Sequence, residues 1–222
     1  FLASALAGLI APLFFGEWKP LVALSLLLAV WIVLSSLLNI VERVQSTRSG
    51  LSFLSAASRQ PRSFFGMHLA HIGVAVFVVG VAMVNGYQAE KDVKMEVGDT
   101  VSVGSYTFKF NGVRSQKGPN YLALVGDVDL IKDGKPIRKL FPEKRNYFTS
   151  SMPMTEAAID SGFLRDVYVS LGEPIDRAKP EAAWAVRVYY KPFVDWIWGG
   201  CLLLALGGLL AVFDRRYGVC PR

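Results

Sequence analysis

The amino-acid sequence predicts an α-helical integral membrane protein with an inserted extracytoplasmic antiparallel β domain, which is a mixed α+β fold. The first supporting observation is that 52% of the residues are hydrophobic. Most of them are gathered in four apolar segments, which is typical of membrane proteins. The second observation is a stretch of about a hundred residues, between the third and fourth segments, in which apolar and polar residues alternate as they do in strands.

Residues 1–63 are predicted to hold transmembrane helices and a basic cytoplasmic loop. The apolar run 1–16 is short for a span and is interrupted by Pro12, so we expect the end of a spanning helix or a re-entrant piece. Residues 21–40 are long enough to span and carry no charge. The chain opens at Phe1 without the basic residues that begin a signal peptide, so a substantial upstream portion is expected to be missing.

Residues 64–86 are predicted to form a transmembrane helix that contains His68 and His71, the only two histidines in the sequence. Residues 192–222 are predicted to form the final transmembrane helix, over 193–213, and a basic cytoplasmic tail. Both apolar runs reach the length of about 20 residues that a membrane helix needs.

The arginines predict the orientation of these helices. Residues 42–62 carry four arginines against one glutamate, and residues 214–222 carry three arginines against one aspartate. By the positive-inside rule both lie in the cytoplasm, so the segment between the third and fourth helices is extracytoplasmic. The basic residues behind the net charge of +6 are therefore interpreted as setting the orientation of the chain in a lipid bilayer. No aromatic-interleaved basic patch accompanies it, so no nucleic-acid partner is predicted.

Residues 87–191 are predicted to be a small antiparallel β domain, either a sandwich or a partial barrel. Strand patterns with turn residues occur in four segments, 100–113, 121–141, 163–173 and 182–193. Asp133 and Gly134 predict a tight turn, and Thr155 to Ile159 are expected to form one short helical turn. The domain has no histidine, no cysteine and no phosphate-binding loop. These absences favour a scaffold or docking surface.

The two histidines raise a choice between two roles. They are three residues apart and share a helical face, and ionisable groups inside a membrane segment are functional candidates. Either they hydrogen-bond a neighbouring helix, or one binds a cofactor. Gly66, Gly73 and Gly80 recur every seven residues and leave a smooth stripe that another helix or a flat group can approach closely. Small residues beside an imidazole also suit a haem pocket.

Geometry limits what a haem could take from this helix. Axial ligands lie on opposite faces of the macrocycle, and two side chains three residues apart on one helix cannot both reach them. A bis-histidine haem would therefore take its second ligand from outside this chain. His71 lies about one turn deeper in the predicted membrane segment than His68, at a depth where coordination must replace hydration.

Long and idiosyncratic stretches resemble the C-terminal third of the CcmF family, with NrfE-like relatives. These include "GMHLAHIGVAVFVVGVAMVNGYQAEKDVKMEVGD", "MTEAAID" and "VYYKPFVDWIWGG". The resemblance covers nearly all of the chain from Gly66 and, more loosely, the helices before it. It implies a subunit of a haem lyase (holocytochrome c synthetase) for cytochrome c-type biogenesis. Such a subunit is a multi-pass protein of the bacterial inner membrane with a periplasmic domain.

The resemblance also implies cofactors and partners. Haem would arrive on the haem chaperone CcmE and be attached to apocytochrome c, with CcmH/CcmI-type subunits assisting. A transmembrane b haem would take His71, in "AHIG", as an iron axial ligand, although Ala70 stands where the family pattern has glycine. His68 has no counterpart in that pattern. The second axial ligand, the incoming-haem site and most of the catalytic part would lie outside this chain, so no catalytic residue is assigned.

Two other functions remain open from the sequence. The first is a non-enzymatic membrane scaffold whose periplasmic domain docks assembly partners and whose histidines only contact helices. The second is a transporter fragment, suggested by the broken helix at Pro12 but not by any charged residue at mid-membrane depth. Cys201 is expected to be an inert small apolar residue.

Overall fold

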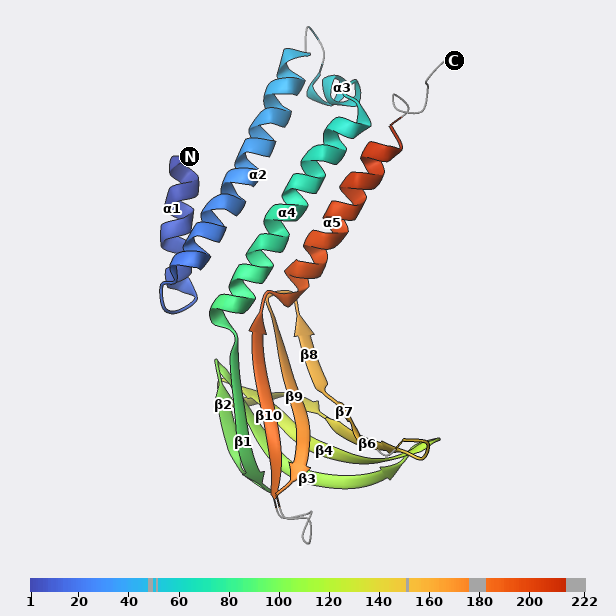
Figure 1. The fold of residues 1–222 in the computed structure, drawn as a ribbon. Helices are drawn as coiled ribbons and strands as arrows, with labels where there is room; N and C mark the ends of the chain where they lie inside the picture. The colour runs from blue at the N-terminus through green and yellow to red at the C-terminus, as the bar shows by residue number, and fades with distance from the viewer. Residues whose placement is uncertain (48–49, 51, 151, 176–182, 215–222) are drawn as a thin grey trace. The chain divides into compact units, whose positions relative to one another are not determined.

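The structure is a computed structural model that describes residues 1–47, 50, 52–150, 152–175 and 183–214 (Figure 1). The chain divides into two compact units. The helical unit comprises Phe1–Tyr87 and Pro192–Arg222, and the β unit comprises Gln88–Lys191. Cys220, in the predicted cytoplasmic tail, lies outside the described residues.

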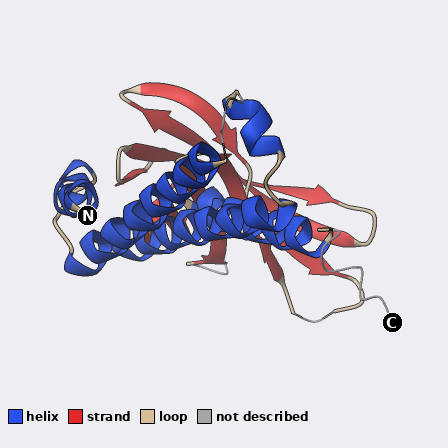
Figure 2. Cartoon of the chain, turned by 90° about the horizontal axis from the view of Figure 1, so that it is seen from above, coloured by secondary structure: helices blue, strands red, loops and turns tan. Residues whose placement is uncertain are grey.

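The helical unit contains five α-helices and one short 3₁₀ helix among the described residues. They are α1 (Leu2–Ile10), η1 (Ala11–Phe14), α2 (Pro20–Ser46), α3 (Phe53–Ser58), α4 (Arg62–Tyr87) and α5 (Val194–Val212). Three of them, α2, α4 and α5, are long and apolar enough to cross a membrane. They lie side by side (Figure 1 and Figure 2). Helices are thus found at the apolar segments 21–40, 64–86 and 193–213, and α2 continues past residue 40 to Ser46.

The first apolar run is a broken helix that packs on α2. The α-helix ends at Ile10, and Pro12 lies in the 3₁₀ turn that follows, as expected for a residue that has no amide hydrogen to donate. A Cβ atom added to Gly8 would lie 2.7 Å from the carbonyl oxygen of Ala23. Such close approach requires glycine at this position, so α1 is held tightly against α2.

Glycines bring α4 and α5 into close contact. A Cβ on Gly66 would lie 2.5 Å from the Gly207 carbonyl oxygen, and one on Gly73 would lie 2.9 Å from the Gly200 carbonyl oxygen. Gly80 faces α5 in the same way. Real Cβ atoms do not approach backbone atoms to such distances, so the two helices pack backbone to backbone, as small residues allow in membranes.

Polar contacts tie the ends of the helices together. The Lys19 ammonium donates to the Gly86 carbonyl oxygen at 2.5 Å, where α2 begins and α4 ends. At the opposite end, the carboxylate of Asp214 accepts from the backbone N–H of Ser63 at 2.9 Å. The amide groups in the first turn of a helix have no partner within the helix. The carboxylate that follows α5 therefore caps the start of α4.

The β unit is a sandwich of two antiparallel sheets. Its strands are β1 (Ala89–Glu96), β2 (Thr100–Val103), β3 (Tyr106–Lys117), β4 (Tyr121–Lys132), β5 (Lys135–Leu140), β6 (Glu143–Tyr147), β7 (Met154–Glu156), β8 (Ala158–Gly162), β9 (Arg165–Pro174) and β10 (Ala183–Pro192). The four-stranded sheet has the order β1-β10-β9-β8, and the six-stranded sheet has the order β2-β3-β4-β6-β7 with β5 beside β4. The core between them includes Phe108, Phe110 and Trp184, all fully buried.

The predicted hairpins are confirmed. The strands β2 and β3 pair, as do β4 and β5, and the turn between the latter places Asp133 and Gly134 at φ of 51° and 75°. Two consecutive positive φ values mark the turn type that Asp-Gly favours. The strands β1 and β6 were not singled out by the sequence patterns.

The expected helical turn at residues 155–159 is wrong. Met154–Glu156 pairs with β6 in one sheet, and Ala158–Gly162 pairs with β9 in the other. The chain thus crosses between the two sheets at Ala157. Glutamate and alanine favour helix locally, but long-range strand pairing overrides a local preference of a few tenths of a kcal/mol per residue.

Candidate functional site

His71 presents its imidazole on the exposed surface of α4. Its Nδ1 atom lies 2.7 Å from the carbonyl oxygen of Met67, one turn earlier. A carbonyl can only accept, so Nδ1 carries a proton and donates it to this bond. In the neutral ring Nε2 then keeps its lone pair. Metal-binding histidines are usually held in this way, with one nitrogen donating to a carbonyl and the other free for the metal.

His68 is in the opposite situation, because its side chain is only 5% exposed. The ring of Phe64 packs edge-on against it, with ring centroids 4.7 Å apart. Neither ring nitrogen has a hydrogen-bond partner among the described residues. A buried polar group without a partner costs free energy. The structure therefore separates the two histidines into one accessible ring and one enclosed ring.

The glycine stripe does not provide space for a flat cofactor. Of the two roles that the sequence left open for it, helix packing is the one observed, because α5 covers Gly66, Gly73 and Gly80. His71 is two positions before Gly73, which at 100° per residue turns it about 160° away from the stripe. The stripe and His71 thus lie on nearly opposite sides of α4. A cofactor bound to His71 would not contact these glycines.

A small apolar cavity lies between α2 and α4, next to the turn that follows His71. Its volume is about 230 Å³, and its lining includes Ala29, Val33, Ala75 and Val79. Small-molecule sites generally occupy about 300–1,000 Å³, so this cavity is too small for a macrocycle. A large planar group at His71 would lie on the exposed side of α4.

Metal-ligating residues do not gather around His71 in the described part of the chain. No group of three or more histidine, cysteine, aspartate or glutamate side chains is found among those residues. His71 could therefore supply one ligand to an iron centre whose other protein ligand comes from elsewhere. This donor set fits a single axial imidazole and does not fit an all-protein metal site.

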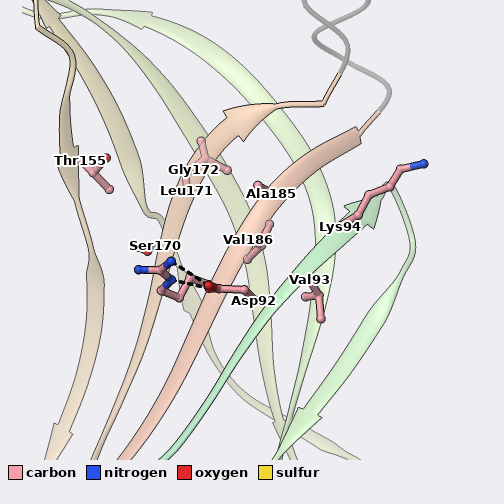
Figure 3. A pocket seen from close by; sticks show the side chains of 10 residues that line it. Asp92, Val93, Lys94, Thr155, Ser170, Leu171, Gly172, Ala185 and Val186 are labelled. Carbon is pink, nitrogen blue, oxygen red and sulfur yellow. Dashed lines mark hydrogen bonds and ion pairs between the residues drawn. The ribbon is translucent and has the colours of Figure 1, made fainter.

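The β unit has a pocket on the outer face of its four-stranded sheet (Figure 3). It measures about 570 Å³ and arises where the outward positions of β9 and β10 carry the small residues Ser170, Gly172 and Ala185. Beside them Arg187 pairs with Asp92. The hydrogen bonds from Arg187 lower the pKa of Asp92. The ten lining residues include no histidine or cysteine, so the pocket has no nucleophile–base pair.

An ionic cluster around the buried Asp160 joins the two sheets of the β unit. Asp160 in β8 accepts from Arg138 in β5 at 2.7 Å, and it also pairs with Arg165 in β9. Arg165 in turn donates to the Tyr106 hydroxyl in β3 at 2.7 Å. Burial alone raises the pKa of Asp160, but the hydrogen bonds and charges of the two arginines outweigh it, and the pKa lies below its ordinary value. No local sequence pattern could predict this cluster, because its members come from four strands.

Comparisons with known proteins agree with the fold of both units. A family model described as CcmF C-terminal beta-sandwich matches residues 86–192. CcmF of Pseudomonas aeruginosa is 44% identical over 98% of this chain and 32% of its own length, and CcmF of Escherichia coli is 41% identical over the same shares. NrfE of Haemophilus influenzae is 35% identical over 69% of this chain and 24% of its own length.

A solved structure titled "Cytochrome c Heme Lyase CcmF" matches 96% of this chain and 34% of that chain, with a TM-score of 0.77. Its sequence identity is 18%, so the likeness is one of fold. The chain spans about a third of the length of the curated relatives it matches. On the combined evidence of the matched β-sandwich and these relatives, the chain belongs to the CcmF family and corresponds to a C-terminal portion of it.

Proposed function

We propose that this chain is part of a cytochrome c biogenesis haem lyase and that His71 is an axial ligand of a transmembrane b haem. The relatives are named cytochrome c-type biogenesis proteins, and the similar structure is titled a heme lyase. The described part of the chain contains three helices long and apolar enough to cross a membrane, and the chain covers only part of those proteins. The catalytic part is therefore assigned to the portion outside it.

The observation that carries this proposal is the state of the His71 ring. Its Nδ1 donates to the Met67 carbonyl oxygen, and its side chain is exposed on a helix that can cross a membrane. An exposed imidazole is costly in hydrocarbon unless something binds it. A haem held there would supply one-electron redox chemistry. The helix contributes a fixed ring orientation and an available Nε2 atom.

The proposal extends to location and partners. The arginine-rich segments support a location of the loop before α4 and the C-terminal tail in the cytoplasm of a bacterium, and of the β unit in the periplasm. There the β unit would dock the haem chaperone CcmE, CcmH/CcmI-type subunits and apocytochrome c. Its outer-face pocket without histidine or cysteine supports a docking role over a catalytic one.

The proposal is tested by the visible spectrum of the purified full-length protein. Replacing His71 with alanine removes an iron–imidazole bond, so the Soret absorption of the b haem is expected to fall sharply and cytochrome c maturation with it. The matched control is His68→Ala, which changes the same residue type three positions away and should leave the spectrum nearly unchanged. In the His71→Gly variant, added imidazole should restore part of the haem.

The same experiment separates the second candidate function, a non-enzymatic scaffold. The packing of the glycine stripe against α5 favours it, because this removes one argument for a haem pocket. Full haem content and normal maturation in the His71→Ala variant would support the scaffold. Loss of haem in the His68→Ala variant alone would reverse the assignment of the two histidines.

A further inference from the structure

We propose that a groove between α2 and α4 is a binding site for one anionic phospholipid. An acyl chain lies along the groove, and the lipid phosphate pairs with the ammonium group of Lys19 at the mouth of the groove. The proposal concerns the helical unit alone and does not depend on any haem. It rests on three observations: the apolar lining of the groove, the charge at its mouth, and the depth of that mouth relative to the membrane helices.

The groove has a volume of about 570 Å³ and is mostly apolar. Its lining includes Leu21 and Val22 on α2 and Phe77, Val78, Val81 and Ala82 on α4. Ser25 and Asn85 also line it, but their side chains donate to their own helices. The Ser25 hydroxyl donates to the Leu21 carbonyl oxygen at 2.8 Å, and the Asn85 amide donates to the Val81 carbonyl oxygen at 3.1 Å. The groove therefore suits a ligand segment without polar groups.

The groove is long and narrow. Its lining on α4 runs from Phe77 to Asn85 and beyond, and eight residues at 1.5 Å each make this length about 12 Å. Spread over that length, the volume corresponds to a mean cross-section of about 50 Å². A helix with its side chains is about 10–12 Å across and needs a cross-section of at least about 80 Å². The groove therefore admits an extended hydrocarbon chain, whereas a helix could only cover it.

A positive charge lies at one end of the groove. The Lys19 ammonium, which lines that end, donates to the Gly86 carbonyl oxygen at 2.5 Å and lies 5.6 Å from the ring centre of Tyr87. Both of these partners are neutral, so neither compensates the charge. An ammonium group has three hydrogens to donate, and a phosphate oxygen can accept one that the Gly86 carbonyl does not use. Charge complementarity thus favours a ligand with an anionic end.

The depth of the charge matches that of a lipid headgroup. The apolar helix α2 begins at Pro20, directly after Lys19, and α4 ends at Tyr87. Trp18, which is 46% exposed, precedes the lysine. Tryptophan and tyrosine gather at headgroup level, and lysine extends its ammonium to the same level. From there the groove runs between the two helices toward the bilayer interior. An anion at the interface with an apolar chain below it is the arrangement of a phospholipid.

The test uses the full-length protein in phosphatidylethanolamine nanodiscs that contain a small fraction of a photoreactive lipid. The two probes are phosphatidylglycerol and phosphatidylethanolamine with a diazirine on the same acyl chain, and mass spectrometry locates the labelled residues. We expect phosphatidylglycerol to label the segment from Phe77 to Asn85 several-fold more than phosphatidylethanolamine does. Leu202, which is 65% exposed on α5, is the reference position, and the two probes should label it equally.

Two pairs of variants assign the preference to the groove. Lys19→Gln can still donate to the Gly86 carbonyl oxygen but has no charge, so the labelling ratio of the two probes should fall to about one. Lys19→Arg keeps the charge and should keep the ratio. Ala82→Phe fills the groove and should reduce its labelling by both probes several-fold. The matched control is Ala205→Phe, at an exposed alanine of α5, which should leave that labelling unchanged.

Three outcomes would overturn the lipid site. Equal labelling of the groove by the two probes in the parent protein would mean ordinary contact with bulk lipid. A groove that neither probe labels, while Leu202 is labelled, would mean that protein covers it. An unchanged ratio in the Lys19→Gln variant would mean that the lysine does not hold the headgroup. The elution profile of each variant establishes that it is folded, and the parent and the Ala82→Phe variant test the site even if Lys19→Gln does not fold.

Discussion

Asp160 in the β unit and His68 in the helical unit are both buried polar side chains, but they are treated in opposite ways. In the β unit, the buried carboxylate of Asp160 is paired with both Arg138 and Arg165. In the helical unit, the buried ring of His68 has no hydrogen-bond partner within the described residues, and the close contacts are made by glycine backbone. The comparison indicates that the β unit pairs its buried carboxylate with residues of the same unit. The helical unit pairs the buried Asp214 carboxylate but leaves the His68 ring without a partner among the described residues.

The strongest test of this comparison replaces glycine at the α4–α5 contact. A Cβ on Gly207 would lie 2.6 Å from the backbone nitrogen of Ala70, whereas nothing lies within 4 Å of one on Gly208. Gly207→Leu is expected to prevent close packing, with a cost of about 3 kcal/mol or more, and to abolish recovery of folded protein from detergent. Gly208→Leu should stay within about 0.5 kcal/mol of the parent. Similar recovery of the two variants would show that the helices do not depend on backbone contact.

The second test removes the charge that joins the sheets. Asp160→Asn leaves Arg138 and Arg165 without their anion and is expected to lower the free energy of unfolding of the β unit by about 3 kcal/mol. The control is Asp92→Asn, which breaks the exposed ion pair with Arg187 and should have little effect, because exposed pairs contribute little. Thermal unfolding followed by calorimetry gives both values.

The pH dependence of stability in the acid range provides a more specific form of this second test. The pKa of Asp160 is lowered in the folded state, so its ionised form is favoured by folding. Its contribution is fully present above the unfolded pKa of about 3.9 and is lost as the pH falls through the lower folded value. The parent should therefore lose stability over this range, and the Asp160→Asn variant should lose less. Parallel pH profiles would mean that the cluster is not held by charge.

The smallest expected effect concerns the connection between β10 and α5. Phe193 has φ of 58° and ψ of 27°, a left-handed conformation that costs a non-glycine residue about 1 kcal/mol. Its ring packs on Phe15 and Trp196, with centroids 5.6 and 5.1 Å away. Phe193→Ala and Phe193→Gly both lose this packing, but glycine also loses the strain. The glycine variant should unfold at the higher temperature, and the reverse order would mean that the backbone is not strained.

The sequence predicts those features that depend on neighbours along the chain. Apolar length predicts α2, α4 and α5, and alternation predicts the hairpins around Asp133 and Gly134. The sequence could not show which element covers the glycine stripe, because Gly66 and Gly207 are far apart along the chain. For the same reason the strands within residues 154–162 were missed. Pairing with distant strands stabilises these strands by more than the local helical preference, and only that local preference is visible in the sequence.

The candidate site divides in the same way. The spacing of His68 and His71 and their place in an apolar helix are visible in the sequence. Which ring is enclosed is not visible, since burial depends on residues packed from other helices. The hydrogen bond from His71 to Met67 is local, at four residues' separation. A helical reading could therefore have anticipated it, because a histidine ring can reach the carbonyl one turn before it.

The contact between α4 and α5 also sets the order of biogenesis. The β unit, Gln88–Lys191, lies between these helices in the chain, so the ribosome completes α4 well before α5. At about 5–20 residues per second, roughly 5–20 s pass while the β unit is synthesised. During that interval the glycine face of α4 is not yet covered by α5. Association of α5 is then a late step, and a stalled chain without α5 would be the natural target of membrane quality control.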